Sequence, residues 1–186
     1  MTSIKSFTQQ FIQDKKMIGS ITPSWRYLVK KIVKRINFSR DKIIVELGPG
    51  TGAFTFKIIE KLKEDSIFLV FELNETFYNH CKRRFHNEDR LHLVHGSVLE
   101  FEKILETQKI SNVDYFISSL PLSLFEKSAI NSIIGKVIPL MNNDGMFVQY
   151  LYSFNRYKLL KKQFNQVTMD MTLLNLPPAI IFKCKK

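Results

Sequence analysis

The sequence of 186 residues lacks most features that mark secreted, metal-binding or membrane-spanning proteins. Its two cysteines, Cys81 and Cys184, lie far apart and form no metal-type pair, which fits a reducing cytoplasm better than a disulfide framework. No apolar run approaches the roughly 20 residues that are needed to cross a bilayer. The N-terminus lacks the apolar core of a signal peptide. These absences predict a cytoplasmic protein that holds no metal ion.

Internal repeats, low-complexity tracts and linkers are also missing, so the sequence predicts a single domain over residues 1–186. Hydrophobic residues make up 45% and charged residues 24% of the chain, which is typical of a globular protein. A chain of this length buries a sizeable core without disulfides. We expect a helical segment over 1–38 to precede an α/β core over 39–186.

Acidic residues are scarce relative to basic ones. The chain has 17 Asp and Glu against 28 Lys and Arg, which gives a net charge of +11. A surplus of this size favours an anionic partner, either a nucleic acid or an anionic membrane surface. A solvated basic surface without a partner has the same composition. Charge alone therefore does not choose among the three interpretations.

The first 36 residues favour two helices. Residues 3–16 carry apolar side chains at helical spacing with lysines beside them. That apolar face either packs on the protein or lies among acyl chains while its lysines meet phosphate head groups. A second, strongly basic helix begins at Thr22, a typical N-cap, and Pro23, a typical first helical residue, and runs to about Ile36.

The rest of the chain alternates between apolar strands and helical patterns. The predicted strands cover 42–47, 67–71, 91–95, 113–118 and 146–151. The predicted helices cover 53–63, 75–86, 98–107, 123–138 and 154–162. The runs 165–174 and 179–184 flank two prolines and are expected to pair as an antiparallel hairpin. This pattern predicts an α/β fold, a doubly wound and mostly parallel sheet of about seven strands.

A glycine-rich loop follows the first predicted strand, in the run Glu46-Leu47-Gly48-Pro49-Gly50-Thr51-Gly52. Glycines let the backbone turn tightly and approach a ligand closely, at the sheet edge where open α/β sheets bind ligands. With Ala53, the spacing also satisfies the loose dinucleotide pattern. Glu46 opposes that alternative because its carboxylate repels a pyrophosphate. It attracts the ammonium and sulfonium groups of S-adenosylmethionine.

Glu72 ends the second predicted strand, 20 residues after Gly52. An acidic residue at this place accepts hydrogen bonds from both ribose hydroxyls of an adenosine cofactor. The alternative is a solvated glutamate at the end of a strand. Glu72 therefore favours a nucleoside without identifying the cofactor.

The run from Val45 to Gly52 resembles the first motif of class I S-adenosylmethionine-dependent methyltransferases, and Glu72 matches their ribose-binding acid. The resemblance implies a Rossmann-like fold with S-adenosylmethionine as cofactor. In that superfamily the loop after the third strand contacts the adenine, often through an Asp, and this chain has Gly96-Ser97-Val98 there. The implied cofactor-binding residues are Glu46, Gly48, Pro49, Gly50, Thr51, Gly52, Glu72, Ser97, Val98 and Ser118.

The run Ser118-Ser119-Leu120-Pro121-Leu122 follows the fourth predicted strand and is compared with two families. Ribosomal RNA adenine dimethyltransferases carry Asn-Leu-Pro-Tyr at this place, where the Asn holds the amine and the ring stacks on the base. This chain has Ser119 and Leu122 instead, so it lacks both the amide and the ring.

Bacterial phospholipid N-methyltransferases, which methylate the amine of phosphatidylethanolamine, are similar at four places. These are 118–122, 18–24, 149–152 and 175–179. Two residues depart from the pattern: Trp25, where a small residue is common, and Ser153, where glycine is common. The departures leave a related aminolipid, such as an ornithine lipid, open as the acceptor.

Methyl transfer to an amine depends mainly on positioning, with the reacting atoms held roughly 3–3.5 Å apart. Tyr150 and Tyr152 are candidate catalytic residues, because strand alternation puts both on one face and their rings attract a methylated ammonium. Core packing is the alternative for both. Ser119 is the third candidate, since the resemblance places the amine-holding residue there.

Three functions therefore remain open. The first is a phospholipid N-methyltransferase. It is expected to be a cytoplasmic monomer that binds the anionic lipid of the inner face of a membrane. The second is an RNA adenine N6-methyltransferase, with nucleic acid as the partner. The third is a protein that binds the cofactor without catalysis. The four histidines show no ligand spacing, so none of the three includes a metal.

Overall fold

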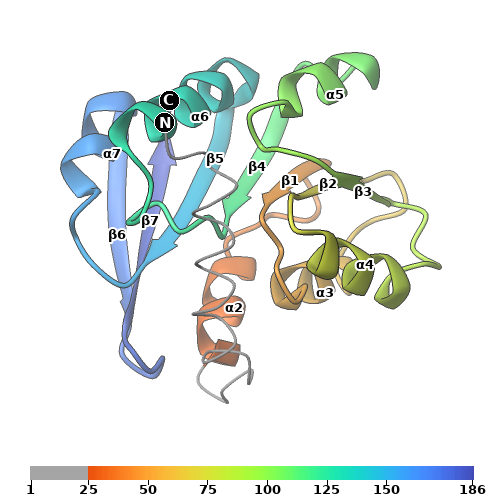
Figure 1. The fold of residues 1–186 in the computed structure, drawn as a ribbon, viewed down its shortest axis with the longest axis horizontal. Coiled ribbons are helices and arrows are strands. Elements are labelled where there is room, and N and C mark those ends of the chain that lie inside the picture. Colours follow the sequence, from red (N-terminus) through yellow and green to blue (C-terminus); the bar gives the residue numbers. More distant parts are fainter. Residues whose placement is uncertain (1–24) are drawn as a thin grey trace.

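A computed structural model describes residues 25–186, which form a seven-stranded sheet with helices on both faces (Figure 1). The strand order is β3-β2-β1-β4-β5-β7-β6. Strands β1 to β5 pair in parallel, whereas β7 is antiparallel to both of its neighbours. The predicted α/β fold, its seven strands and its terminal hairpin are confirmed.

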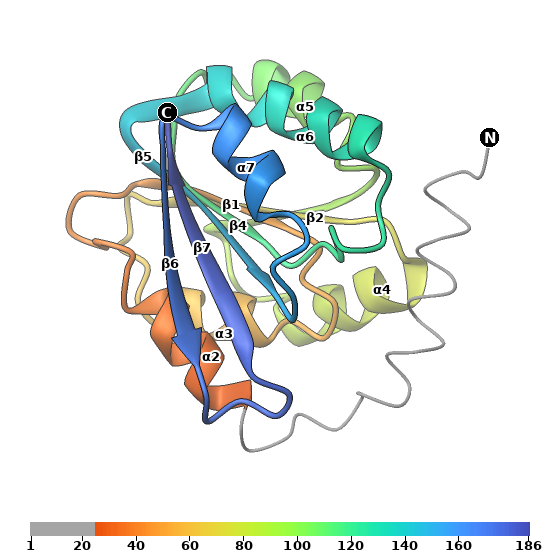
Figure 2. The same cartoon turned by 90° about the vertical axis from the view of Figure 1, so that its left-hand side faces the viewer.

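The strands have the following bounds: β1 Ile43–Leu47, β2 Ile67–Glu72, β3 Leu91–His95, β4 Val113–Ser118, β5 Met141–Leu151, β6 Gln166–Thr172 and β7 Ala179–Lys185. The helices that connect them are α2 Trp25–Val33, α3 Ala53–Ile59, α4 Glu75–Arg84, α5 Phe101–Thr107, α6 Lys127–Leu140 and α7 Tyr157–Gln163. Helices α2, α3 and α4 lie on one face of the sheet and α5, α6 and α7 on the other (Figure 2).

The central strands are buried on both faces, as expected for parallel strands that are covered by helices. Alternate residues therefore enter two separate cores. In β1, Ile44 packs in the core beneath α2 and α3, whereas Val45 packs in the core beneath α5, α6 and α7. This double burial explains why the strands read as continuous apolar runs.

Strand direction brings several loops to one edge of the sheet. The carboxyl ends of β1 to β5 meet there because these strands are parallel. The last pair of the hairpin, Thr172 with Ala179, lies next to the pair of Leu151 with Ile180. The turn over residues 173–178 therefore lies at the same carboxyl edge as the glycine loop.

Helix α6 begins at Lys127, so the prediction that it begins at residue 123 was wrong. The guanidinium of Arg156 donates to the carbonyl oxygens of Leu122, Ser123 and Phe125 at 2.7–3.1 Å. Those carbonyls are bound to a side chain from a distant segment. Residues 122–126 therefore form a loop instead of the first turn of α6.

Other boundaries also differ from the predictions. Helix α5 begins three residues later than expected, because residues 97–100 form a turn in which the Glu100 amide donates to the Ser97 carbonyl at 3.0 Å. Strand β5 begins at Met141 rather than residue 146, because Met141 pairs with Val113 ahead of an irregularity in the register. Helices α2, α3, α4 and α7 have ends that differ by a few residues from those predicted.

The predicted helix over 3–16, the start of the second helix at Thr22 and Pro23, and the motif over 18–24 lie outside the described residues. Over 25–186, none of the helices combines the length and the apolar character that crossing a membrane requires.

A stability prediction follows from Asp114, which anchors the start of β1. Its Oδ2 atom accepts hydrogen bonds from the amides of Lys42 at 2.8 Å and Ile43 at 3.0 Å. We expect Asp114→Ala to lower the free energy of unfolding by about 2–3 kcal/mol, because two partly buried backbone amides lose a charged hydrogen-bond acceptor. Urea denaturation measures this change.

The matched control is Asp144→Ala, because the Asp144 side chain is 84% exposed and its contact with Arg40 is 3.9 Å long. This control is expected to change stability by less than about 0.5 kcal/mol. Equal midpoints for the two variants would contradict the role of Asp114.

Candidate functional site

The glycine loop after β1 has a backbone that only glycine adopts easily. Gly48, Gly50 and Gly52 have φ angles of 76°, 57° and 75°. A residue with a side chain is strained in this left-handed region. The three glycines therefore fix the path of the loop at the carboxyl edge, where the backbone is free to approach a ligand.

Side chains from α4 pack directly beneath this loop. A Cβ atom on Gly52 would lie 2.8 Å from Cε2 of Phe85 and 3.3 Å from the Cys81 sulfur. The Cys81 thiol donates to the Gly50 carbonyl at 3.5 Å. Burial, together with the charges of Glu46 and Glu72, raises the pKa of Cys81 to about 12, so the thiol stays neutral at physiological pH. Cys81 of α4 and Phe85, which caps the end of that helix, thus pack against the loop.

The Glu72 carboxylate joins the loops after β1 and β2. Its Oε2 accepts from the Gly50 amide at 3.0 Å and its Oε1 accepts from the Asn74 amide at 2.8 Å. The side chain is almost completely buried. Asn74 in turn caps α4, since its side chain accepts from the Phe77 amide at 3.0 Å. The predicted ribose-binding acid therefore lies directly against the glycine loop.

Glu46 is fully buried below the same loop. The Thr55 hydroxyl, from the first turns of α3, donates to Glu46 Oε2 at 2.7 Å. A buried carboxylate is a strong source of negative potential, because the surrounding protein screens it weakly. Glu46 and Glu72 thus place two carboxyl groups at this corner of the sheet edge, and Arg84 also reaches it by donating to the Thr51 carbonyl at 3.2 Å.

The loop after β3 also reaches this edge. The Ser97 hydroxyl accepts from the Leu99 amide at 3.1 Å, and Val98 is buried in the core. His95, at the end of β3, stacks on Tyr78 of α4 with ring centroids 4.7 Å apart. The structure thus places an aromatic pair, which sequence reasoning missed, beside the predicted positions.

Ser118 ends β4 and Ser119 begins the loop after it, and both are buried. Gln149 of β5 is fully buried behind it, and its Nε2 atom donates to the Leu120 carbonyl at 3.0 Å and to the Tyr150 carbonyl at 2.7 Å. Arg156 donates to the carbonyls of Leu122, Ser123 and Phe125, as described above. Two side chains from β5 and its continuation therefore hold this loop in place.

Tyr150 and Tyr152 lie on one face, as the strand alternation predicted, with ring centroids 6.1 Å apart. Tyr150 is buried and also contacts Trp25 at 5.4 Å and Phe54 at 5.8 Å, whereas Tyr152 is 42% exposed. The core-packing alternative thus describes Tyr150 well, and Tyr152 remains open to solvent.

Neither tyrosine is suited to act as a base near neutral pH. Burial, and then the neighbouring Tyr152, raises the pKa of Tyr150 far above its ordinary value, and an interaction with Ser119 offsets only part of this shift. Burial also raises the pKa of Tyr152, against an opposing interaction with Asn175. Both hydroxyls therefore stay protonated.

The structure brings the predicted site residues to one sheet edge, at the carboxyl ends of β1, β2, β4 and β5 or in the loops that follow β1, β3, β4 and β5. Gln149, Arg156 and Asn175 were not predicted as site residues. Gln149 offered a signal, since it is an amide within an otherwise apolar strand. Arg156 offered none, because its partners lie about 30 residues away in the chain.

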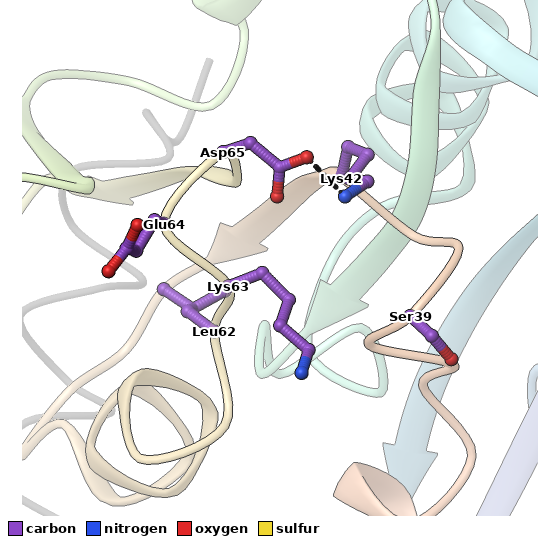
Figure 3. A pocket seen from close by; sticks show the side chains of 6 residues that line it. All are labelled: Ser39, Lys42, Leu62, Lys63, Glu64 and Asp65. Carbon is purple, nitrogen blue, oxygen red and sulfur yellow. Dashed lines mark hydrogen bonds and ion pairs between the residues drawn. The ribbon is translucent and has the colours of Figure 1, made fainter.

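A surface hollow lies at the opposite, amino edge of the sheet (Figure 3). It is lined by Ser39, Lys42 and residues 62–65, and the Lys42 ammonium forms an ion pair with Asp65 there. Strands β1 and β2 begin beside it, so it lies away from the glycine loop. Across residues 25–186, no group of His, Cys, Asp and Glu side chains is arranged to hold a metal ion.

The model of one protein family, described as ribosomal RNA adenine dimethylase, matches residues 2–132. The chain belongs to the ribosomal RNA adenine dimethylase family. The match covers the glycine loop, Glu72 and the loop after β4, so the family's region coincides with the edge described above.

The relatives of this protein differ in how much of its chain they resemble. An ornithine lipid N-methyltransferase from Singulisphaera acidiphila is 28% identical over 182 residues, which are 96% of this chain and 94% of the relative. A ribosomal RNA small subunit methyltransferase A from Sulfurihydrogenibium is 30% identical over 59% of this chain and 44% of the relative. One from Ureaplasma parvum is 28% identical over 70% and 47%. The chain thus spans about half of these ribosomal RNA methyltransferases.

Solved methyltransferases share the fold. A precorrin-6y C5,15-methyltransferase from Geobacter metallireducens superposes with a TM-score of 0.67 at 10% identity over 86% of this chain and 88% of that one. An S-adenosylmethionine-dependent O-methyltransferase from Thermotoga maritima gives 0.62 at 13% identity over 84% and 64%. The family and the fold together identify a class I methyltransferase that uses S-adenosylmethionine.

A prediction follows from the packing under Gly52. We expect Gly52→Ala to lower the free energy of unfolding by about 2–4 kcal/mol, because the new Cβ meets Phe85 and the residue keeps a left-handed φ. The affinity for S-adenosylmethionine should fall with it. Thermal unfolding and calorimetric titration measure the two effects.

Gly135→Ala is the matched control, because a Cβ at this helical position has no neighbour within 4 Å. It should leave cofactor affinity unchanged and raise stability by about 0.5–1 kcal/mol. A tolerated Gly52→Ala with normal affinity would show that the loop repacks freely.

Proposed function

We propose that this methyltransferase transfers methyl groups to the amine of a membrane aminolipid, such as phosphatidylethanolamine or an ornithine lipid, at the inner face of a membrane. The observation that carries the proposal is the extent of similarity to the ornithine lipid enzyme, which runs through 96% of this chain and 94% of that one. Similarity to the two ribosomal RNA enzymes covers only 59% and 70% of this chain and less than half of each of those proteins. The lipid enzyme therefore matches the last strands, which contribute Tyr150, Tyr152 and Asn175 to the edge.

The residues at the carboxyl edge fit S-adenosylmethionine. The glycines of the loop, with Pro49 and Thr51, would let the cofactor approach the backbone, and Glu72 would accept the ribose hydroxyls. Ser97 and Val98 would line the adenine side, and Ser118 the methionine side. The buried carboxylates of Glu46 and Glu72 favour a cofactor that carries ammonium and sulfonium charges over a pyrophosphate. When bound, S-adenosylmethionine supplies a methyl group on a positively charged sulfur.

The acceptor amine would lie between the loop after β4 and the end of β5. Ser119 and the carbonyls of that loop offer hydrogen-bond acceptors, and Gln149 and Arg156 keep the loop fixed. The Oε1 atom of Gln149 is buried and has no hydrogen-bond partner among residues 25–186. Buried acceptors of this kind suit the N–H groups of an amine.

The exposed ring of Tyr152, with Tyr150 packed against it, would hold the amine as it gains methyl groups. A ring attracts an ammonium by about 0.5–2 kcal/mol, and this attraction does not require an N–H donor. The protonated hydroxyls described above exclude both tyrosines as the base. The amine would therefore lose its proton to water, and catalysis would rest on positioning.

A second candidate function is methylation of adenine in RNA, which the family match and the net charge of +11 favour. The loop after β4 argues against it. A flipped base needs an aromatic surface for stacking, and Leu122 at this place is aliphatic and buried.

The deciding assay supplies labelled S-adenosylmethionine with vesicles of phosphatidylethanolamine, ornithine lipid and an anionic lipid, followed by extraction into organic solvent. We expect label in the lipid phase, and chromatography then identifies the head group. Label that appears only when structured RNA is supplied would refute the lipid substrate and support the second candidate.

A separate prediction concerns the cofactor half of the site. In Glu72→Gln, one of the two backbone amides that donate to Glu72 would face an NH₂ group instead of an oxygen. We expect S-adenosylmethionine affinity to fall about tenfold or more, because a charged acceptor is lost from both the loop and the ribose. Glu46→Ala should weaken binding as well. Calorimetric titration measures each affinity.

The control for this prediction is Glu75→Gln, three residues further along the chain at the exposed start of α4. Its affinity should equal that of the unaltered protein. Normal affinity in both Glu72→Gln and Glu46→Ala would overturn the assignment of the cofactor site.

A further inference from the structure

The turn between β6 and β7 exposes its apolar residues and buries its polar one. Leu173, Leu174 and Leu176 are 74%, 65% and 80% exposed, whereas Asn175 between them is 2% exposed. The Asn175 amide side chain donates to the Pro177 carbonyl at 2.7 Å. This bond holds the turn in a shape that directs three leucines outward. We name these three residues the leucine tip.

The leucine tip lies at the edge where the acceptor would bind. The turn follows directly on the pairing of β6 with β7, and the neighbouring strand β5 ends at Leu151, just before Tyr152. Most other large apolar side chains that are exposed among residues 25–186 belong to the same edge, namely Tyr27, Leu124, Tyr152 and Phe154. Single exposed apolar residues are ordinary, but a gathering of them marks an interaction surface.

A basic helix lies beside the leucine tip. In β6, Asp170 binds Lys31 at 2.7 Å and Arg35 at 3.0 Å, so α2 is tied to the hairpin. Both views show the turn and the first residues of α2 at the same end of the molecule (Figures 1 and 2). Arg26 and Lys30 are exposed on α2, and Lys34 is exposed directly after it. Apolar side chains thus project from an edge that is flanked by cations.

This combination selects one kind of partner. Aliphatic side chains enter the acyl region of a bilayer, and cations beside them attract phosphate head groups. Nucleic acid would require aromatic or basic side chains at the tip, since leucine neither stacks on bases as a ring does nor binds phosphate. A protein groove would leave the cations of α2 without an assigned partner.

We infer that the leucine tip and the exposed face of α2 form a docking surface for an anionic lipid bilayer. The surface would hold the acceptor edge against the membrane, so that a lipid head group reaches Tyr152 without leaving the bilayer. The inference rests on the proposed lipid substrate. It adds which residues enter the membrane and how the protein is oriented there.

The test compares the full chain with a variant that carries Leu173→Ser, Leu174→Ser and Leu176→Ser. Binding to vesicles of phosphatidylethanolamine and phosphatidylglycerol is measured by co-sedimentation, and methylation is measured on the same lipids dispersed in detergent. We expect vesicle binding to fall at least about tenfold, because three apolar side chains no longer leave water. Methylation in detergent should stay within about twofold, because the tip lies outside the cofactor loop and detergent replaces docking.

Two further variants control for folding and for general loss of apolar surface. The replacement of the same three leucines by phenylalanine should restore vesicle binding. The pair Met169→Ser and Phe56→Ser removes exposed apolar side chains in the body of β6 and on α3, and it should leave binding unchanged. Equal losses in this pair and in the serine tip variant would overturn the inference.

The remaining outcomes separate docking from substrate. Vesicle binding that depends on the leucine tip, without lipid methylation, would support the docking surface and refute the lipid as acceptor. Lipid methylation would support the lipid as acceptor, and vesicle binding that the serine variant leaves unchanged would refute the docking surface. Binding to an RNA hairpin, but not to vesicles, would overturn the inference.

Discussion

The site depends on one carboxylate between two strands. Glu72 accepts the amides of Gly50 and Asn74, and so joins the loops that follow β1 and β2. The glycine loop also contacts Cys81 and Phe85, and the Arg84 guanidinium donates to its Thr51 carbonyl at 3.2 Å. Because Glu72 is buried, its charge stays effective at the loop, where a positively charged cofactor gains most from it. A single residue thus contributes to both the geometry and the electrostatics of the loop.

The acceptor side of the edge is organised by different means. The loop after β4 makes backbone hydrogen bonds of its own, and side chains from β5 and from the segment after it also bind its carbonyls. Gln149 supplies one such bond, to the Leu120 carbonyl, and Arg156 supplies three. Gln149 lies in β5 beside Tyr150, and Arg156 follows the end of that strand, so one segment of the chain carries the tyrosines and also holds the loop. The parallel sheet therefore couples the two halves of the site through neighbouring strands.

The family match supports S-adenosylmethionine-dependent methyl transfer, and we propose that the last two strands select the acceptor. The hairpin of β6 and β7 brings the leucine tip to the edge that carries Tyr152. A lipid head group and a flipped base both present an amine to such an edge. The surroundings decide which one arrives, and here they combine exposed leucines with a basic helix.

The sequence by itself determined the class of fold, the strand order along the chain, the glycine loop and Glu72. These features are local: apolar runs, glycine spacing and a carboxylate at a strand end are visible without knowing any partner. Tertiary structure alone decided where α6 begins, because Arg156 binds carbonyls that lie about 30 residues away. It also decided that Tyr150 is buried, that His95 stacks on Tyr78, and that the leucines of the last turn face outward around a buried asparagine. Each depends on contacts between distant segments, and the side-chain period of a strand or helix does not encode them.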